Sequence, residues 1–266
     1  MSMNINKNGL SIFLEGDKKK TPVVFIHGFP FDHNMWKNQT DKFSSDYFCI
    51  SYDIRGLGIS EPGDGQYTME SFVDDLEMLV LEMKLEKPIV CGFSMGGYIS
   101  LRAIEKMPEN FRALILCDTK SAADNNEGKI NRAAGIKKIN VEGVTKFVEE
   151  FIPNCFCEYS LENRKELVHT CITNSEYFSP VGIKGCLLAM AGRTDTTDSL
   201  SKIEIPALVL CGEEDNLTTP DVMMGMADKI HNSEFYTIPK SGHLSPLENP
   251  DVVNKHIENF LKKMRK

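Results

Sequence analysis

The sequence predicts an α/β fold in which a mostly parallel central sheet is flanked by helices and carries an inserted helical cap. Three features support this class: short apolar runs, helical patterns between those runs, and one long segment in which the alternation stops. Strands that are covered on both faces of a parallel sheet are almost continuously apolar, as these runs are. The alternation therefore implies right-handed strand–helix–strand units in a single sheet.

Six apolar runs predict the strands of this sheet: residues 23–26, 48–52, 89–91, 113–117, 207–211 and 235–238. Between the second and third runs, apolar side chains recur at helical spacing from Met69 to Met83 and predict an amphipathic helix. The last helix is expected to begin at Pro250, because proline suits the first helical position and Asn249 before it is a favoured cap.

The alternation stops between residues 121 and 200. This segment contains helical patterns at 144–152, 164–173 and 181–191 but no convincing buried strand. We therefore expect a core formed by residues 1–120 and 201–266, with residues 121–200 inserted as a helical cap. A chain of 266 residues in this architecture commonly folds as one unit.

Composition and charge narrow the possible partners and the compartment. A formal net charge of −8 and an isoelectric point near 5.4 argue against a nucleic-acid partner, which would need a clustered basic surface. The polar N-terminus resembles no secretory signal, and no apolar run approaches the ~20 residues that span a bilayer. The 8 cysteines, several of them in predicted strands, favour a reducing cytoplasm. Nothing indicates the oligomeric state.

The strongest local motif is a G-x-S-x-G sequence at residues 92–96, between a predicted strand and a helical stretch at 97–107. A serine in a sharp strand-to-helix turn needs neighbours without side chains two positions away on either side. The turn exposes the serine hydroxyl near the free N–H groups of the following helix, which favour developing negative charge. Ser94 is therefore the predicted nucleophile.

Serine is a weak nucleophile until a base accepts its proton, so the position of each histidine matters. His243 follows the predicted strand 235–238, at the carboxyl edge where open α/β sheets bind their ligands. His27 also follows a strand, but the glycine after it favours a backbone role. The other histidines lie in polar contexts that are typical of surface positions: His33, His169, His231 and His256. We therefore predict that His243 is the base.

A carboxylate behind the base holds its tautomer and stabilises the imidazolium. Asp215 follows the predicted strand 207–211 through a short turn and is the favoured acid. Asp118, directly after the neighbouring strand 113–117, is the main alternative, and Glu213 and Glu214 are nearby competitors. The turn gives Asp215 reach toward His243, whereas the position of Asp118 suits a hinge or capping role at the entrance to the cap.

A tetrahedral intermediate also needs two backbone donors for its oxyanion. One is expected to be the N–H of Met95, which follows the nucleophile, and the other to come from the loop after the strand 23–26. In that loop Phe29 keeps an N–H and Pro30 has none, so Phe29 is the predicted second donor. Phe93 is expected to join Phe29 and Met95 in forming an apolar substrate pocket.

Four blocks of sequence resemble the α/β-hydrolase superfamily in order. Residues 27–30 resemble its oxyanion loop, 53–60 its D-x-R-G-x-G-x-S loop, 92–96 its nucleophile elbow, and 212–215 with 242–243 its acid and base segments. The resemblance covers nearly the whole chain apart from the cap, and it includes the order serine, aspartate, histidine. The loop at 53–60 is interpreted as a packing and turn element.

The tail of the chain is similar to the group of 3-oxoadipate enol-lactonases and small carboxylesterases. In this region Arg193 could recognise a substrate carboxylate, since a guanidinium suits one, but a structural pair with Asp195 or Asp198 is slightly favoured. Haloalkane dehalogenases and epoxide hydrolases share the fold but carry an aspartate at the position of Ser94, which disfavours both.

These observations predict a serine hydrolase that cleaves a small carboxylic ester or lactone through an acyl-enzyme. Neither a cofactor nor a metal is expected. The alternatives are a ligand sensor with slow or single turnover, a thioesterase or acyl-carrier esterase, and a cofactor-free haloperoxidase or perhydrolase. The acyl and alcohol preferences are not indicated by the sequence.

Overall fold

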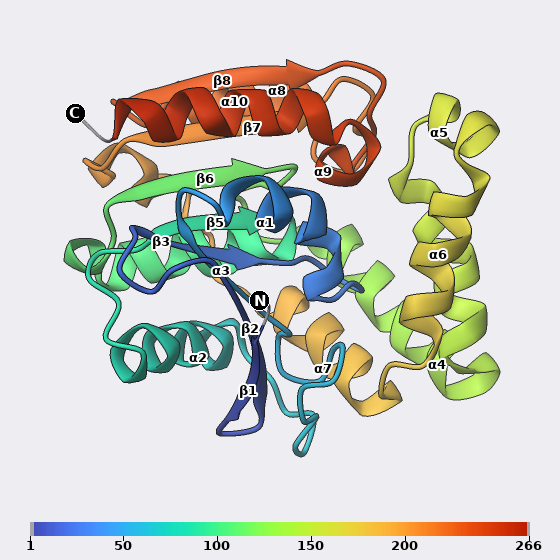
Figure 1. Cartoon of the computed structure of the whole chain (residues 1–266). Helices are drawn as coiled ribbons and strands as arrows, with labels where there is room; N and C mark the ends of the chain where they lie inside the picture. The colour runs from blue at the N-terminus through green and yellow to red at the C-terminus, as the bar shows by residue number, and fades with distance from the viewer. Residues whose placement is uncertain (1–2, 265–266) are drawn as a thin grey trace.

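The computed structural model describes residues 3–264, and all six predicted strands lie in one eight-stranded sheet (Figure 1). The strands are β1 (Met3–Lys7), β2 (Leu10–Glu15), β3 (Pro22–Ile26), β4 (Phe48–Tyr52), β5 (Ile89–Phe93), β6 (Ala113–Cys117), β7 (Ala207–Gly212) and β8 (Ser233–Ile238). The predicted fold class, a mostly parallel sheet flanked by helices, is confirmed.

The strand order is β1-β2-β4-β3-β5-β6-β7-β8. All neighbours from β4 to β8 run parallel, whereas β1 and β2 form an antiparallel hairpin at one edge. The sequence analysis did not identify this hairpin. The side chains of β1 are largely exposed, so its sequence is not the continuous apolar run that a central strand requires. The carboxyl ends of β3, β5, β6 and β7 meet at one edge of the sheet and form the base on which the site is built.

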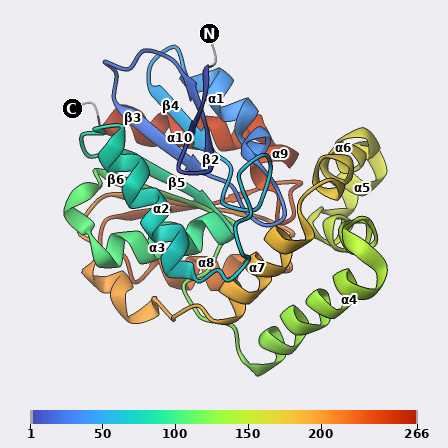
Figure 2. The same ribbon diagram turned by 90° about the horizontal axis from the view of Figure 1, so that it is seen from below.

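The helices of the described chain lie on both faces of the sheet and beyond its carboxyl edge. They are α1 (Lys37–Phe43), α2 (Met69–Glu82), α3 (Met95–Lys106), α4 (Asn126–Phe151), α5 (Glu158–Asn163), α6 (Lys165–Glu176), α7 (Pro180–Ala191), α8 (Pro220–Ala227), α9 (Ser245–Glu248) and α10 (Pro250–Lys263). Helices α1 and α10 cover one face, and α2, α3 and α8 cover the other (Figures 1 and 2).

Local signals explain where several helices begin and how they pack. Helix α2 begins with a capping box, in which the Thr68 hydroxyl accepts from the Ser71 N–H at 3.1 Å and the Ser71 hydroxyl accepts from the Thr68 N–H at 3.3 Å. The predicted apolar stripe from Met69 onward is buried against the sheet. Each fully buried aliphatic or aromatic side chain of this kind stabilises the fold by about 1.5–3 kcal/mol.

Residues 121–200 form helices and no strand, and helices α4, α5 and α6 extend beyond the carboxyl edge of the sheet (Figures 1 and 2). Residues 196–200, at the end of this segment, lie against the last turns of α3, where the Ser199 hydroxyl donates to Glu105. Helix α4 begins earlier than the pattern at 144–152 suggested and bends at Gly143, which has a φ of 89°. Helices α6 and α7 pack against α4. Within residues 3–264, no helix combines the length and apolarity needed to cross a membrane.

Candidate active site

Ser94 lies in a sharp turn between β5 and α3. Its backbone has a φ of 48° and a ψ of −112°, a conformation that non-glycine residues rarely adopt. A Cβ at Gly92 would collide with the carbonyl of Gly96 and the hydroxyl of Ser100, so the turn requires glycine there. The Ser94 carbonyl accepts a hydrogen bond from the Thr119 hydroxyl at 2.7 Å, which helps to hold the strained turn.

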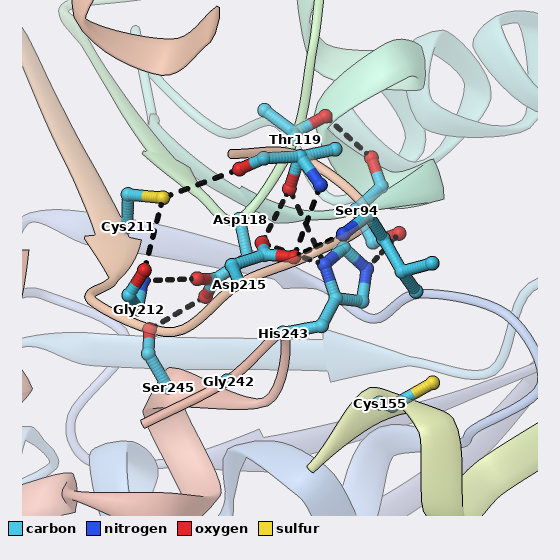
Figure 3. A network of polar contacts seen from close by, with 12 residues as sticks. Ser94, Asp118, Thr119, Cys155, Cys211, Gly212, Asp215, Gly242, His243 and Ser245 are labelled. Carbon is cyan, nitrogen blue, oxygen red and sulfur yellow. Dashed lines mark hydrogen bonds and ion pairs between the residues drawn. The ribbon is translucent and has the colours of Figure 1, made fainter. Parts of the chain in front are cut away.

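The structure brings His243 and Asp215 together with Ser94 (Figure 3). The Nε2 atom of His243 lies 2.9 Å from Ser94 Oγ, and its Nδ1 atom lies 2.9 Å from Asp215 Oδ2. An ionised carboxylate only accepts hydrogen bonds, so Nδ1 carries the proton and Nε2 is free to accept from the serine hydroxyl. The arrangement can remove a proton from Ser94 and stabilise the resulting imidazolium.

Asp215 is held by the turn that follows β7. Its Oδ1 accepts the backbone N–H groups of Leu217 at 2.8 Å and Thr218 at 3.0 Å, and its Oδ2 accepts the Thr218 hydroxyl at 2.6 Å. Burial opposes ionisation of this carboxyl, but the charge and hydrogen bond of His243 and the bonds from Thr218 outweigh it and lower the pKa of Asp215. The carboxylate is therefore kept ionised beside His243, the predicted base.

Asp118 lies next to this group but makes different contacts. Its carboxylate accepts the Gly212 N–H at 2.7 Å and the Ser245 hydroxyl at 2.5 Å, and no hydrogen bond joins it to His243 (Figure 3). Burial and the neighbouring negative charge of Asp215 raise the pKa of Asp118 well above its usual range. Asp118 thus anchors the start of the Asp215 turn instead of contacting the imidazole.

Glu248 holds the loop that carries His243, a contact that the sequence analysis did not find. Its buried carboxylate accepts the N–H groups of Gly242 at 2.8 Å and Leu244 at 3.3 Å, on either side of the histidine. It also accepts the Cys157 N–H at 2.9 Å. Glu248 therefore connects the loop that carries His243 to the helical segment formed by residues 121–200. The signal in the sequence is an acidic residue among apolar positions just after the histidine.

The predicted oxyanion loop lies directly against Ser94, the predicted nucleophile. A Cβ at Gly28 would come within 3.0 Å of Ser94 Cβ and 2.6 Å of the Phe93 ring, so the chain passes without room for a side chain. Met95 is the first residue of α3, where an N–H group has no partner within the helix. The Phe93 ring is buried 5.2 Å from the imidazole of His243 and is not part of the cavity wall formed by the described residues.

A cavity of about 350 Å³ opens beside Ser94 and His243. Apolar side chains from the oxyanion loop and from helices α4 and α7 form one part of its wall: Phe29, Phe147, Phe151, Leu187 and Met190. Polar and charged side chains form another part: Tyr98, Lys120, Asp124, Asn131, Arg132 and Thr218. The site is therefore a small cavity that combines apolar and charged side chains and opens onto Ser94, the predicted nucleophile.

Arg193 is engaged in contacts within the protein. Its Nη1 atom lies 2.7 Å from Asp124 Oδ1, its Nη2 atom donates to the Ala122 carbonyl at 2.6 Å, and its guanidinium lies over the Tyr98 ring at 4.1 Å. The residue is 6% exposed and does not line the cavity that contains Ser94. Its ion pair is with Asp124, and not with Asp195 or Asp198 as the sequence analysis considered.

The family described as the alpha/beta hydrolase fold matches residues 21–155. An esterase from Thermogutta terrifontis, in a malate-bound structure, is 35% identical over the full length of both chains and superposes with a TM-score of 0.91. The chain belongs to the α/β-hydrolase family.

Two curated relatives point to different reactions on this fold. The 3-oxoadipate enol-lactonase 2 of Acinetobacter baylyi is 26% identical over 248 residues, 93% of this chain and 91% of that one. BpoC of Mycobacterium tuberculosis, which carries the name of a non-heme bromoperoxidase, is 29% identical over 252 residues, 90% of this chain and 93% of that one. The resemblance to esterases and enol-lactonases is confirmed, whereas membership of the family leaves the substrate open.

In this α/β-hydrolase the loop after β4 is a structural element. Asp53 accepts the His33 N–H at 2.8 Å and the Ile59 N–H at 2.9 Å, which closes the loop. His27 donates from Nδ1 to the Gly28 carbonyl at 2.8 Å and accepts the Ile54 N–H at Nε2 at 2.9 Å. Burial lowers the pKa of His27, in keeping with a neutral ring that ties the oxyanion loop to its neighbour.

Asp118, Cys211 and Asp215 offer three ligand atoms within 4.8 Å of one another. Each group is already used: Asp118 binds Gly212 and Ser245, and Asp215 binds His243. Burial raises the pKa of the Cys211 thiol, which donates to the carbonyls of Gly212 and Thr218. The chemistry of these groups fits hydrogen bonding better than metal coordination.

Proposed function

We propose that this α/β-hydrolase cleaves a small carboxylic ester or lactone through an acyl-enzyme on Ser94. The observation that carries the proposal is the hydrogen-bonded series Ser94–His243–Asp215, whose two contacts measure 2.9 Å each and whose Ser94 and His243 line the cavity. The esterase and enol-lactonase relatives support the same reaction class.

Acylation begins when Ser94 Oγ attacks the substrate carbonyl carbon while His243 Nε2 accepts the serine proton. The carbonyl oxygen becomes an oxyanion, for which we propose the N–H groups of Phe29 and Met95 as donors. The tetrahedral intermediate collapses, the C–O bond to the alcohol breaks, and His243 returns the proton to that alcohol. Loss of one such donor costs other hydrolases about 2.7–4 kcal/mol.

Deacylation repeats these steps with water. His243 accepts a proton from water as the water oxygen attacks the acyl carbon, and the second intermediate expels Ser94 Oγ, which takes the proton back. Asp215 stays ionised throughout and stabilises the imidazolium in both halves of the reaction. Neither acylation nor deacylation requires an external oxidant or reductant.

We propose that residues 121–200 act as a cap over a hydrolase core formed by residues 1–120 and 201–266. The side chains that α4 and α7 contribute to the cavity wall support this division. A volume of about 350 Å³ lies near the lower end of the range for small-molecule sites and favours a small substrate.

A reducing, cytoplasmic location belongs to the same proposal. All eight cysteines are buried and unpaired, as is usual where thiols stay reduced.

The test is steady-state hydrolysis of p-nitrophenyl esters of two to eight acyl carbons, alongside an enol-lactone, by the wild-type chain and by Ser94→Ala. We expect turnover of at least one short substrate by the wild type and a loss of more than about 10⁴-fold in kcat for the variant. Ser45→Ala, at an exposed position outside the cavity wall, is the matched control and should retain full activity. Turnover that survives in Ser94→Ala would contradict the mechanism.

Perhydrolysis is a second candidate, favoured by the similarity to BpoC. Hydrogen peroxide would replace water as the nucleophile that cleaves the acyl-enzyme, with a peracid as the product. The measurement is peracid formation during ester hydrolysis in added peroxide. A peracid yield no greater than in a reaction without enzyme would remove this candidate and leave hydrolysis.

A further inference from the structure

One wall of the cavity carries hydrogen-bond donors that the described chain does not satisfy. Lys120 contributes to this wall two residues after Asp118, at the carboxyl edge of the sheet, and is half-buried. No carboxylate among residues 3–264 lies within ion-pair distance of its ammonium group. Burial lowers the pKa of Lys120, and the charge of Arg193 adds to that effect.

Arg132 reaches the same wall from α4. Its Nε atom donates to Asp124 Oδ2 at 3.0 Å, and its two Nη groups have no acceptor in the part of the chain that the structure describes. Asp124 Oδ1 also accepts a hydrogen bond from Arg193 Nη1 at 2.7 Å, so this carboxylate is shared by two guanidinium groups. Asp124 makes no hydrogen bond or ion pair with Lys120, although its charge and that of Asp215 favour the protonated ammonium.

Tyr98 supplies a third unsatisfied donor. It lies one turn along α3 from Ser94, is only 6% exposed, and lines the cavity. Its ring packs under Arg193, but its hydroxyl makes no hydrogen bond to any residue from 3 to 264. The hydroxyl oxygen itself is not among the fully buried atoms of the described chain, so it is accessible from the cavity that Tyr98 lines and can donate to a ligand atom there.

We propose that the natural substrate carries a carboxylate, in addition to the ester or lactone group, which binds against Lys120, Arg132 and Tyr98. A carboxylate only accepts hydrogen bonds, and this wall offers mainly donors. The chain as a whole is acidic, with a net charge of −8, so the two basic side chains Lys120 and Arg132 form a local concentration of positive charge on the cavity wall. The apolar side chains of α4 and α7 on the rest of the wall suit the carbon chain between the two groups. This inference rests on the proposed ester hydrolysis.

The test compares two ethyl esters of nearly equal shape, monoethyl glutarate, which carries a carboxylate, and ethyl hexanoate, which is neutral. We expect the wild type to prefer the anionic ester in kcat/KM. Lys120→Met should reduce that preference about tenfold, mainly through KM, since a charge-assisted hydrogen bond is lost. Tyr98→Phe keeps the ring under Arg193 and should reduce the preference by a smaller factor. Lys129→Met removes the same charge from an exposed position on α4 and should leave the preference unchanged.

A binding measurement separates this inference from the proposed function. Calorimetric titration of Ser94→Ala with monoethyl glutarate should give saturable binding that weakens about tenfold when Lys120→Met is added, since charged hydrogen bonds dominate such contacts. If the wild type hydrolyses neither ethyl ester, nor any of the p-nitrophenyl esters or the enol-lactone, yet this binding is found, the proposed hydrolysis fails and the carboxylate site stands. If ethyl hexanoate is hydrolysed but Lys120→Met leaves both the preference and the binding unchanged, the carboxylate site is overturned.

Discussion

Two neighbouring strands, β6 and β7, are each followed by a buried aspartate, and the surroundings shift the pKa values of the two carboxyl groups in opposite directions. At the end of β7, contacts with His243 and Thr218 lower the pKa of Asp215 despite its burial. At the end of β6, burial and the nearby charge of Asp215 raise the pKa of Asp118. Burial is common to both residues, so the difference comes from the groups that each carboxylate meets.

The chain geometry after each strand explains which groups those are. Asp118 follows β6 directly and has a φ of 45°, so its side chain stays within the sheet edge and binds the Gly212 N–H at 2.7 Å. Asp215 lies three residues beyond the end of β7 and reaches His243 at 2.9 Å. The first aspartate therefore positions the turn that carries the second, and only the second contacts the imidazole.

Asp215→Asn should produce the largest effect on this pair. An amide keeps the shape but loses the charge, and it no longer holds the imidazole in the tautomer that accepts from serine. In a comparable triad this change lowers kcat by about 10⁴-fold. The measurement is kcat on one short ester, with circular dichroism to establish that the variant is folded. A folded variant with near wild-type kcat would remove Asp215 from the mechanism.

Thr218→Val should have an intermediate effect. The Thr218 hydroxyl donates at 2.6 Å to the same Asp215 oxygen that faces His243, so its loss weakens the stabilisation of the ionised carboxylate. We expect kcat to fall about tenfold, the equivalent of roughly 1.4 kcal/mol in the barrier. Thr218→Ser retains the hydroxyl and is the control. Equal losses in both variants would show that packing, and not the hydrogen bond, matters here.

Asp118→Asn should have a smaller effect on activity. The amide oxygen can still accept from Gly212, and the amide group can pair with the Ser245 hydroxyl, so the turn remains anchored. We expect kcat within about tenfold of wild type, a barrier change below ~1.4 kcal/mol. A dead but folded Asp118→Asn, beside an active Asp215→Asn, would reverse the assignment of the acid.

The smallest effect should appear in the pH dependence of stability. The folded-state pKa of Asp215 is lowered, so its contribution is present above its unfolded pKa and is lost as the pH falls through the folded value. The folded-state pKa of Asp118 is raised, so its contribution is present below its unfolded pKa and is lost as the pH rises through the folded value.

Urea unfolding at several pH values between about 2 and 7 covers both windows, because the Asp215 contribution changes below the unfolded aspartate pKa of about 3.9 and the Asp118 contribution changes above it. Relative to wild type, Asp118→Asn should gain unfolding free energy as the pH rises, and Asp215→Asn should lose it. Parallel curves for the wild type and both variants would contradict the opposite environments of the two carboxylates.

Much of this fold is predictable because the central strands have a sequence signature. Continuous apolar runs locate β3 to β7, and the glycines around Ser94 locate the turn between β5 and α3. The hairpin β1–β2 was not predicted, because an edge strand with exposed side chains lacks that signature. The first half of α4 was missed for a similar reason, since most of its residues are exposed and carry no apolar stripe.

Part of the candidate site depends on contacts between residues that are far apart in the sequence, and these contacts could not be predicted. Chain order and strand ends are enough to nominate Ser94, His243 and Asp215. The role of Glu248 depends on contacts with Gly242 and Cys157, and the latter lies 91 positions away in the sequence. The charged wall of the cavity likewise combines residues of the sheet edge with a residue of α4, so it exists only once the chain is folded.

The central claim is that Ser94 is the nucleophile of this site, and covalent labelling tests it most directly. The wild-type chain and Ser45→Ala, treated with a fluorophosphonate, should each gain one adduct by intact mass, mapped by peptide sequencing to residue 94. Ser94→Ala should gain none. An adduct that persists in Ser94→Ala, or that maps to another residue in the wild type, would contradict the account.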